Sequence, residues 1–247
     1  MSTHPPRKTQ GIQAVERALT ILDALIAANK PMRLIDLANT VHMSTPTILR
    51  NVVSLEKHNY LRRLEDGRYQ LGARALEMGE RYKRSFDLES HVLPVLERVC
   101  NATGESSSFN VREGSRRVCL FKLESSQQLR AGFGVVAEND LRDGTSTAQA
   151  LCISPEELEN NRFRVIFVSQ GLNVEDLASL STPIYRRSGE LIGALTVICP
   201  ISRFTPARQE RLAEALHQHA EDLSSTVGAQ RFGKNNYSLV PSISDIP

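Results

Sequence analysis

The sequence lacks the features that mark exported and membrane-spanning proteins. Its four cysteines form no CxxC pair and stand far apart, at Cys100, Cys119, Cys152 and Cys199. The first ten residues, MSTHPPRKTQ, have no apolar core of the kind found in a secretory signal. No apolar run approaches the roughly 18 to 20 residues that span a bilayer. These absences argue against export and membrane insertion, and they predict a soluble cytoplasmic protein.

Motifs for catalysis and cofactor binding are also missing. There is no GxSxG, GxGxxG, P-loop or HExxH segment. Thiol catalysis needs a cysteine beside a histidine base, but His91, His217 and His219 fall on predicted helices far from any cysteine motif. His217 and His219 are two residues apart, so they lie on different helix faces and make a poor metal pair. We therefore expect no enzyme activity, no cofactor and no metal site.

What the sequence does contain is enough apolar residues for a core and an uneven distribution of charge. At 247 residues and 40% hydrophobic content, it suits one large or two ordinary domains. Up to Arg84 there are 14 Lys and Arg against 8 Asp and Glu, and the remainder has 16 against 20. The first part is thus net +6 and the rest net −4. This asymmetry predicts that only the first part meets a polyanion, unless it is a chance imbalance.

Residues 12–72 have the pattern of three short helices followed by a hairpin. Over residues 13–29, apolar side chains recur every three or four positions, which predicts an amphipathic helix. Its inner face would consist of Val15, Leu19, Leu22 and Ile26. A second helix fits residues 33–41. The third is expected to have Thr45 as N-cap, Pro46 at its first position and a core stripe of Ile48, Val52 and Leu55.

The outward face of the third helix and the hairpin after it carry groups suited to DNA. With its apolar stripe inward, the helix presents polar side chains at Thr45, Thr47, Arg50, Asn51 and Ser54. Short polar groups near a helix N-terminus can reach base edges in the major groove. The segment YLRRLEDGRYQLG has an Asp-Gly hairpin turn, and its cations are Arg62, Arg63 and Arg68. We interpret it as a wing that contacts phosphates; a winged helix serving only protein contacts is the alternative.

Beyond the hairpin, the pattern changes from helices to short strands. Residues 73–86 predict a helical linker and residues 88–100 another helix. The strand candidates are SSSFNV, RRVCLFKL, QLRAGF, RVIFVS, LASLSTPIY and ELIGALTVI, and a final helix starts at Thr205-Pro206. Strands between flanking helices predict an α+β domain over residues 87–228 with a mostly antiparallel sheet. Residues 229–247 show no period and are expected to form a flexible tail.

The order of these parts resembles the IclR family of bacterial transcription regulators over about residues 12–228. The segments that carry the resemblance are AVERALTILDAL, STPTILRNVVSLEKHNYLRR and LASLSTPIYRRSGELIGALTVICPISRFT. The resemblance implies a winged helix-turn-helix DNA-binding domain, a linker helix and a C-terminal effector domain of GAF-like fold. Family members commonly dimerise through their DNA-binding domains and often pair further into tetramers. We therefore expect a homodimer or tetramer on double-stranded operator DNA, with repression favoured over activation.

The resemblance also implies an effector site in the C-terminal domain. Its residues would be Gly144, Thr145, Ser181, Thr182, Thr196 and Ile198. Hydroxyl and backbone donors suit the carboxylate of a small organic acid, because burying an unpaired charge is costly. However, the segment between Leu151 and Val165 is much shorter than in most members of the family. Two interpretations stay open: a regulator modulated by an organic-acid effector, and a regulator whose C-terminal domain only oligomerises.

Overall fold

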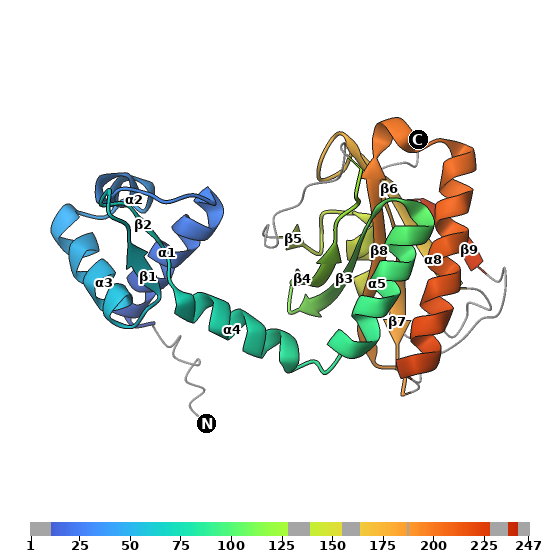
Figure 1. Cartoon of the computed structure of the whole chain (residues 1–247), viewed down its shortest axis with the longest axis horizontal. Coiled ribbons are helices and arrows are strands. Elements are labelled where there is room, and N and C mark those ends of the chain that lie inside the picture. Colours follow the sequence, from blue (N-terminus) through green and yellow to red (C-terminus); the bar gives the residue numbers. More distant parts are fainter. Residues whose placement is uncertain (1–10, 128–138, 155–163, 187, 228–236, 242–247) are drawn as a thin grey trace, which may run out of the picture. The chain divides into compact units, whose positions relative to one another are not determined.

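The chain folds into two compact units, one ending at Ser85 and the other beginning at Phe86 (Figure 1). The computed structural model describes residues 11–127, 139–154, 164–186, 188–227 and 237–241. Each unit has an apolar core of its own. The helix-and-hairpin unit followed by a sheet unit confirms the predicted fold class, while the strand candidate QLRAGF lies outside the described residues.

The first unit contains three helices, a hairpin and a fourth helix. They are α1 (Gln13–Ala28), α2 (Leu34–Thr40), α3 (Thr45–Lys57), β1 (Leu61–Arg63), β2 (Tyr69–Leu71) and α4 (Ala73–Arg84). The predicted stripe of α3 is buried, because Ile48, Val52 and Leu55 recur on one side of the helix and pack into the core. The N-cap of α3 is Ser44, one residue before the expected Thr45.

The inner face of α1 is not the one predicted from its apolar spacing. Ile21 and Leu25 are its buried residues, whereas Val15, Leu19 and Ile26 are 52, 54 and 44% exposed. The helix carries apolar side chains on two faces, and a spacing of three and four residues fits both of them. Of the four predicted residues only Leu22 packs against the core, so the prediction was wrong for Val15, Leu19 and Ile26.

The second unit is built around a seven-stranded sheet. Its strands are β3 (Ser106–Glu113), β4 (Arg116–Leu123), β5 (Asn139–Asp140), β6 (Arg164–Gln170), β7 (Leu177–Tyr185), β8 (Leu191–Pro200) and β9 (Tyr237–Pro241). They lie in the order β5-β4-β3-β8-β7-β6-β9, and every pair is antiparallel except β6 with β9. The helical elements are α5 (Glu89–Thr103), α6 (Ser146–Cys152), the short 3-10 helix η1 (Ile201–Arg203) and α8 (Pro206–Val227).

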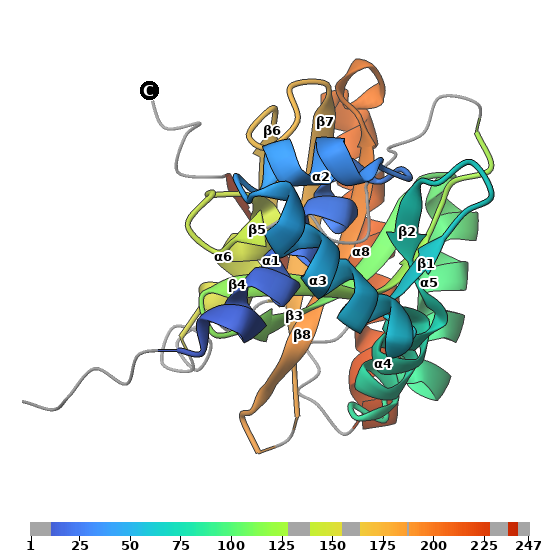
Figure 2. The same cartoon turned by 90° about the vertical axis from the view of Figure 1, so that its left-hand side faces the viewer.

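The two faces of this sheet are covered by different helices. Alternation along β6 sends Ile166 and Val168 into the core beneath α5 and α8, and sends Val165 and Phe167 toward α6. Accordingly, α5 and α8 lie side by side on one face (Figure 1). The shorter α6 packs on the other face, against β6, β7 and β8 (Figure 2). The residues predicted for an effector site belong largely to the α6 side.

Strand β9 corrects the prediction of a flexible tail over residues 229–247. Tyr237 pairs with Arg164 and Pro241 with Val168, so the strand runs parallel to β6. This pairing covers a backbone edge that β6 would otherwise expose. A five-residue strand without strict alternation has too little period for a sequence pattern to reveal. Residues 228–236 and 242–247 lie outside the described part of the chain.

Candidate functional site

The outward face of α3 carries the predicted base-reading groups. Because the apolar stripe of α3 is fixed in the core, the opposite side of the helix faces outward. On it, Thr45 and Arg50 are exposed, and Thr47 and Asn51 are half-buried. All four side chains predicted to read bases are therefore accessible on the outward side of α3.

Hydrogen bonds within α3 engage part of this face. Ser44 Oγ lies 2.9 Å from Thr47 Oγ1, and Asn51 Nδ2 donates to the carbonyl of Thr47 at 2.9 Å. Ser54 Oγ donates to the carbonyl of Arg50 at 3.0 Å. The Arg50 guanidinium has no ion-pair partner among the described residues. Its donors can therefore pair with a guanine edge or a phosphate without breaking an existing contact.

Strands β1 and β2 form the predicted hairpin and present its arginines to solvent. Arg62 lies opposite Gln70, and Arg63 lies opposite Tyr69. At the turn, Gly67 adopts a left-handed backbone with φ of 81° and donates its N–H to the carbonyl of Leu64 at 3.0 Å. The Arg63 guanidinium is 5.9 Å from the centre of the Tyr69 ring, within range of a cation–π contact. Both Arg62 and Arg63 are exposed.

The third arginine of the hairpin is paired with an acid. Asp66 accepts from the backbone N–H of Arg68 at 3.1 Å and from its Nε at 2.7 Å. These two hydrogen bonds, the backbone one first, hold the pKa of Asp66 below its ordinary value. Asp66 therefore offsets part of the charge of Arg68 at the tip of the hairpin. Arg62 and Arg63 are the more available cations for a phosphate.

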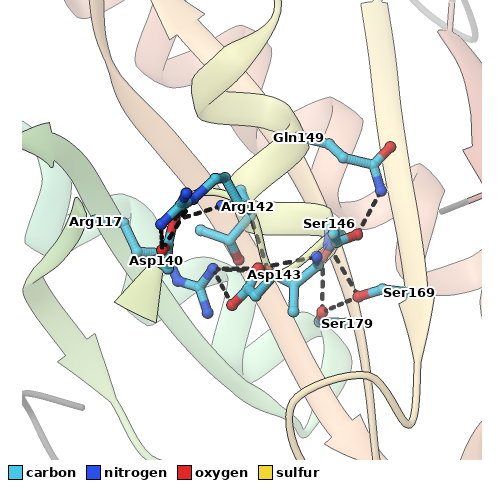
Figure 3. A network of polar contacts seen from close by, with 12 residues as sticks. Arg117, Asp140, Arg142, Asp143, Ser146, Gln149, Ser169 and Ser179 are labelled. Carbon is cyan, nitrogen blue, oxygen red and sulfur yellow. Dashed lines mark hydrogen bonds and ion pairs between the residues drawn. The ribbon is translucent and has the colours of Figure 1, made fainter. Parts of the chain in front are cut away.

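In the second unit, Gly144 and Thr145 lie just before α6. The preceding residue, Asp143, is paired with Arg117 on β4 (Figure 3). Arg117 Nη1 donates to Thr145 Oγ1 at 2.8 Å and lies 2.8 Å from Asp143 Oδ2. The Thr145 N–H and hydroxyl both donate to Asp143 Oδ1, at 3.1 and 2.8 Å. The carbonyl of Gly144 accepts from Gln149 Nε2 at 2.7 Å. The Thr145 donors predicted for a ligand are thus used within the protein, whereas the contact of Gly144 uses its carbonyl as an acceptor.

Beneath α6, side-chain hydroxyls from α6 and three strands form a hydroxyl cluster. Its members are Ser146, Thr147, Ser169, Ser179, Ser181 and Thr196. Ser181 Oγ is its centre, 2.9 Å from Ser146 Oγ, 3.1 Å from Thr147 Oγ1 and 2.9 Å from Thr196 Oγ1. Ser181 and Thr196 are fully buried, because they face each other across β7 and β8 under α6.

The remaining two predicted effector residues have different surroundings. Thr182 follows Ser181 along β7, so its side chain leaves from the opposite side of the strand. Its hydroxyl donates to the carbonyl of Val165 at 2.8 Å, outside the hydroxyl cluster. Ile198 pairs with Ser179 and Ser106 across the sheet and is 9% exposed. Of the six predicted residues, only Ser181 and Thr196 join the hydroxyl cluster.

Several polar residues of this region were not predicted as site residues from the sequence. They are Arg117, Asp143, Ser146, Thr147, Ser169 and Ser179. The segment DGTST held a signal for three of them, since its density of hydroxyls is unusual for a helix start that packs on a sheet. Arg117 gave no such signal, because an arginine in a strand is ordinarily a surface charge.

Within the described ranges, no helix is long and apolar enough to cross a membrane. The same residues contain no group of three or more His, Cys, Asp or Glu side chains placed to hold a metal ion. The candidate sites are therefore the face of α3 with its hairpin and the polar region around α6.

Two family models match the chain, and together they cover more than half of it. The model of the IclR helix-turn-helix domain matches residues 14–65. The model of the bacterial transcriptional regulator IclR C-terminal domain matches residues 143–225. The first contains α3 and the start of the hairpin, and the second contains α6 and the strands of the hydroxyl cluster.

Curated proteins and solved structures give the same pattern of similarity. The glycerol operon regulatory protein of Streptomyces griseus is 25% identical over 90% of this chain and 99% of its own. The HTH-type transcriptional repressor AllR of Salmonella paratyphi A is 23% identical over 90% of this chain and 93% of its own. An IclR homolog of Microbacterium hydrocarbonoxydans, solved with 4-hydroxybenzoate, is 20% identical with a TM-score of 0.66. That comparison covers 86% of this chain and all of the other, and it shows a common fold.

Proposed function

The chain belongs to the IclR family of bacterial transcription regulators, and from this premise we propose that it represses transcription as a symmetric dimer on operator DNA. The matched models and relatives are DNA-binding regulators, so the chain is a transcription regulator and not an enzyme. We further propose that it acts in the cytoplasm and that a small organic acid changes its operator affinity. Repression is favoured because curated relatives include proteins named as repressors.

The observation that carries DNA binding is that α3 and the hairpin are anchored in one core and both expose groups suited to DNA. One small core holds the helix with its polar side outward and the hairpin with Arg62 and Arg63 exposed. Cations on a hairpin supply salt-dependent affinity for phosphates, and short polar groups on a helix supply sequence choice. The net charge of +6 up to Arg84 favours the same partner.

Symmetric dimerisation is supported by the exposed face of α1. Val15, Leu19 and Ile26 lie on it, and Leu22, which is half-buried against the core, stands between them at spacings of four, three and four residues. This is the spacing of a coiled-coil seam, which an equivalent helix of a second copy can cover. A two-fold dimer would place two α3 helices on two half-sites of an inverted repeat.

Binding of the full chain to genomic fragments tests the DNA-binding proposal. Fragments upstream of the gene itself and of its neighbours would be compared with random DNA by fluorescence anisotropy at physiological salt. We expect a fragment bound about 100-fold or more tighter than random DNA, with footprints on both halves of an inverted repeat. If every fragment bound no better than random DNA, this assignment of the α3 face would be wrong.

An organic-acid effector is supported by the buried polar region beside α6. It combines a cation, Arg117, with hydroxyls on two central strands. A structural neighbour of the same fold binds 4-hydroxybenzoate, which is an organic acid. A competing function is favoured by one observation: the hydroxyls of the cluster are already bonded to one another. On that view the second unit only oligomerises.

Calorimetry distinguishes these two functions. The full-length protein would be titrated with a panel of small organic acids that includes 4-hydroxybenzoate, and operator affinity would be measured with each acid. An effector must bind the DNA-competent and DNA-incompetent forms unequally, so it must shift operator affinity. If no acid in the panel binds or shifts that affinity, the oligomerisation-only function replaces the sensor.

A further inference from the structure

The guanidinium of Arg117 is a buried positive charge whose partner comes from a turn of the same chain. Its side chain is 7% exposed, and Nη1 lies 2.9 and 2.8 Å from the two carboxylate oxygens of Asp143. Within the described ranges, no other carboxylate is placed on this guanidinium. Asp143 is the more accessible member, with its side chain 21% exposed. A buried charge of this kind needs an anion beside it at all times.

Ser146 and Thr147, which follow Asp143 in the sequence, form hydrogen bonds with hydroxyls on the strands of the sheet. The hydroxyl cluster has six members and six hydroxyl–hydroxyl contacts. Each hydroxyl has one proton to donate, so six contacts use all six protons. Ser181, Thr147 and Thr196 donate around a closed ring, and Ser169, Ser179 and Ser146 donate in sequence toward it. While Ser146 and Thr147 are in place, no hydroxyl of the cluster has a proton left for a ligand.

We propose that residues 143–147 are a built-in competitor of the effector, and that Arg117 receives the effector's carboxylate when this segment withdraws. The proposal rests on the effector response proposed above and adds the binding group and the chemistry of competition. Asp143 stands in for the carboxylate of the ligand, while Ser146 and Thr147 stand in for its polar oxygens. An organic acid with a second oxygen acceptor reproduces both sets of contacts.

This arrangement defines what can compete with the segment. A neutral molecule would leave the Arg117 charge unpaired after Asp143 withdraws, so only an anion can take its place. A ligand carboxylate can accept from the guanidinium as Asp143 does. Withdrawal of Ser146 and Thr147 also frees one donor of the Ser181–Thr196 pair for a second oxygen, while the other proton stays in the bond between them. Because the ligand binds only the withdrawn form, it shifts the population toward that form.

Removing the competing charge tests the proposal. Asp143→Asn deletes the charge and keeps an oxygen that can accept from Thr145. The probe is sodium formate, compared with sodium chloride at equal ionic strength, and the readouts are the melting temperature and calorimetric affinity of the full chain. We expect formate to raise the melting temperature of Asp143→Asn above its value in chloride, and to bind it at least about tenfold tighter than wild type.

Two controls make the result specific to Arg117. Asp140 pairs with Arg142 in the same turn, but that pair is open, with side chains 44 and 87% exposed (Figure 3). Asp140→Asn therefore leaves a solvated arginine and should show no formate-specific effect. The double variant Arg117→Gln with Asp143→Asn removes the buried charge, so it should lose the formate effect of the single variant. If Asp143→Asn is unfolded in chloride, refolding in formate is the expected result, and failure to refold while the double variant folds overturns the proposal.

The outcomes separate this inference from the effector function it rests on. Equal formate effects on Asp143→Asn and the double variant overturn the role of Arg117. An organic acid that shifts operator affinity equally in wild type and Arg117→Gln overturns it as well, while leaving the effector function intact. A formate effect confined to Asp143→Asn supports the anion site even if no acid shifts the operator affinity of wild type, in which case only the effector function fails.

Discussion

At the scale of single residues, the arginines of the hairpin are not equivalent. Arg62 and Arg63 are exposed, whereas Arg68 is paired with Asp66 at 2.6 Å. We expect Arg62→Ala and Arg63→Ala each to lower the log–log salt slope of DNA binding by about one unit. Arg68→Ala should lower it by less, because Asp66 already offsets part of its charge. Affinities for random and operator DNA over a salt series measure the slopes.

Arg81 on α4 provides the matched control for these variants. It is a surface arginine of the same unit, with a side chain 78% exposed and paired with Glu77 at 3.3 Å, so it matches the paired Arg68 most closely. Arg81→Ala should leave the slope unchanged if the hairpin is the phosphate contact. Unchanged slopes for Arg62→Ala and Arg63→Ala would instead remove the hairpin from the interface.

Arg50 is expected to act on sequence choice rather than on general affinity. Its guanidinium lies on the exposed side of α3 without an ion-pair partner among the described residues. If it pairs with a guanine, Arg50→Ala should narrow the gap between operator and random DNA by about 1 to 3 kcal/mol. Parallel titrations of both DNAs measure this gap. Equal losses on the two DNAs would assign Arg50 to a phosphate.

Cysteine reactivity should follow burial. Cys199 is fully buried on β8, and desolvation raises the pKa of its thiol to about 12. Cys152 at the end of α6 is exposed. Because the thiolate is the reactive form, a thiol reagent at pH 8 should label Cys152 first and Cys199 only after unfolding. Peptide mass spectrometry of native and denatured protein measures this order, and early labelling of Cys199 in the native protein would contradict its burial.

The sequence predicted the outward residues of α3 but not the ion pairs, because only the former follow from a local pattern. Helix periodicity alone placed Thr45, Thr47, Arg50 and Asn51 on an outward face, because a buried stripe dictates the opposite side. The pairing of Asp66 with Arg68 depends on turn geometry that residue types do not specify. Buried ion pairs such as that of Arg117 depend on contacts between segments far apart in the sequence. Such contacts leave no local pattern.

At the scale of elements, α1 and β9 are the two cases in which sequence patterns did not predict the structure. Helix α1 has apolar residues on two faces, and only packing decides that Ile21 and Leu25 enter the core. Strand β9 is too short for a period and is defined by its pairing with β6. By contrast, LASLSTPIY is β7 over its full length, because a long β-rich segment is a strong local signal.

The contact between α6 and the sheet predicts the effect of a change in the hydroxyl cluster. Thr196 Oγ1 lies 2.9 Å from Ser181 Oγ and 3.3 Å from Thr147 Oγ1, and the residue is fully buried. Thr196→Val keeps the volume but opens this ring, so it should lower the free energy of unfolding by roughly 1 kcal/mol. If Thr196 also contacts the effector, the variant should weaken the effector response by a similar amount. Urea unfolding and operator titrations measure the two effects.

Val197 offers a matched comparison for that variant. It follows Thr196 on β8, is equally buried and faces the apolar core beneath α5 and α8. Val197→Thr places a hydroxyl in an apolar core, so it should destabilise the unit without altering the effector response. A normal effector response in Thr196→Val would separate the hydroxyl cluster from effector binding.

At the scale of the whole molecule, the two units differ in net charge, and each has its own apolar core. The first unit is basic, with its polar helix and hairpin outward, and the second is acidic, with a large sheet between helices. If the proposed effector binds in the second unit, a dimer that reads two half-sites would report its binding, because a change in half-site spacing would lower operator affinity.

The exposed face of α1 gives the test of that assembly. Leu19 lies at the middle of the apolar spacing and is 54% exposed. If a second copy covers this face, Leu19→Glu buries two charges in the seam and should weaken dimerisation by at least about tenfold, with a matching loss of operator affinity. Sedimentation over a concentration series and titration of full and half operators measure both. Val174→Glu, at an apolar residue of the second unit that is 43% exposed, should change neither. A Leu19→Glu protein that keeps the association constant and operator affinity of wild type would show that the two copies meet elsewhere.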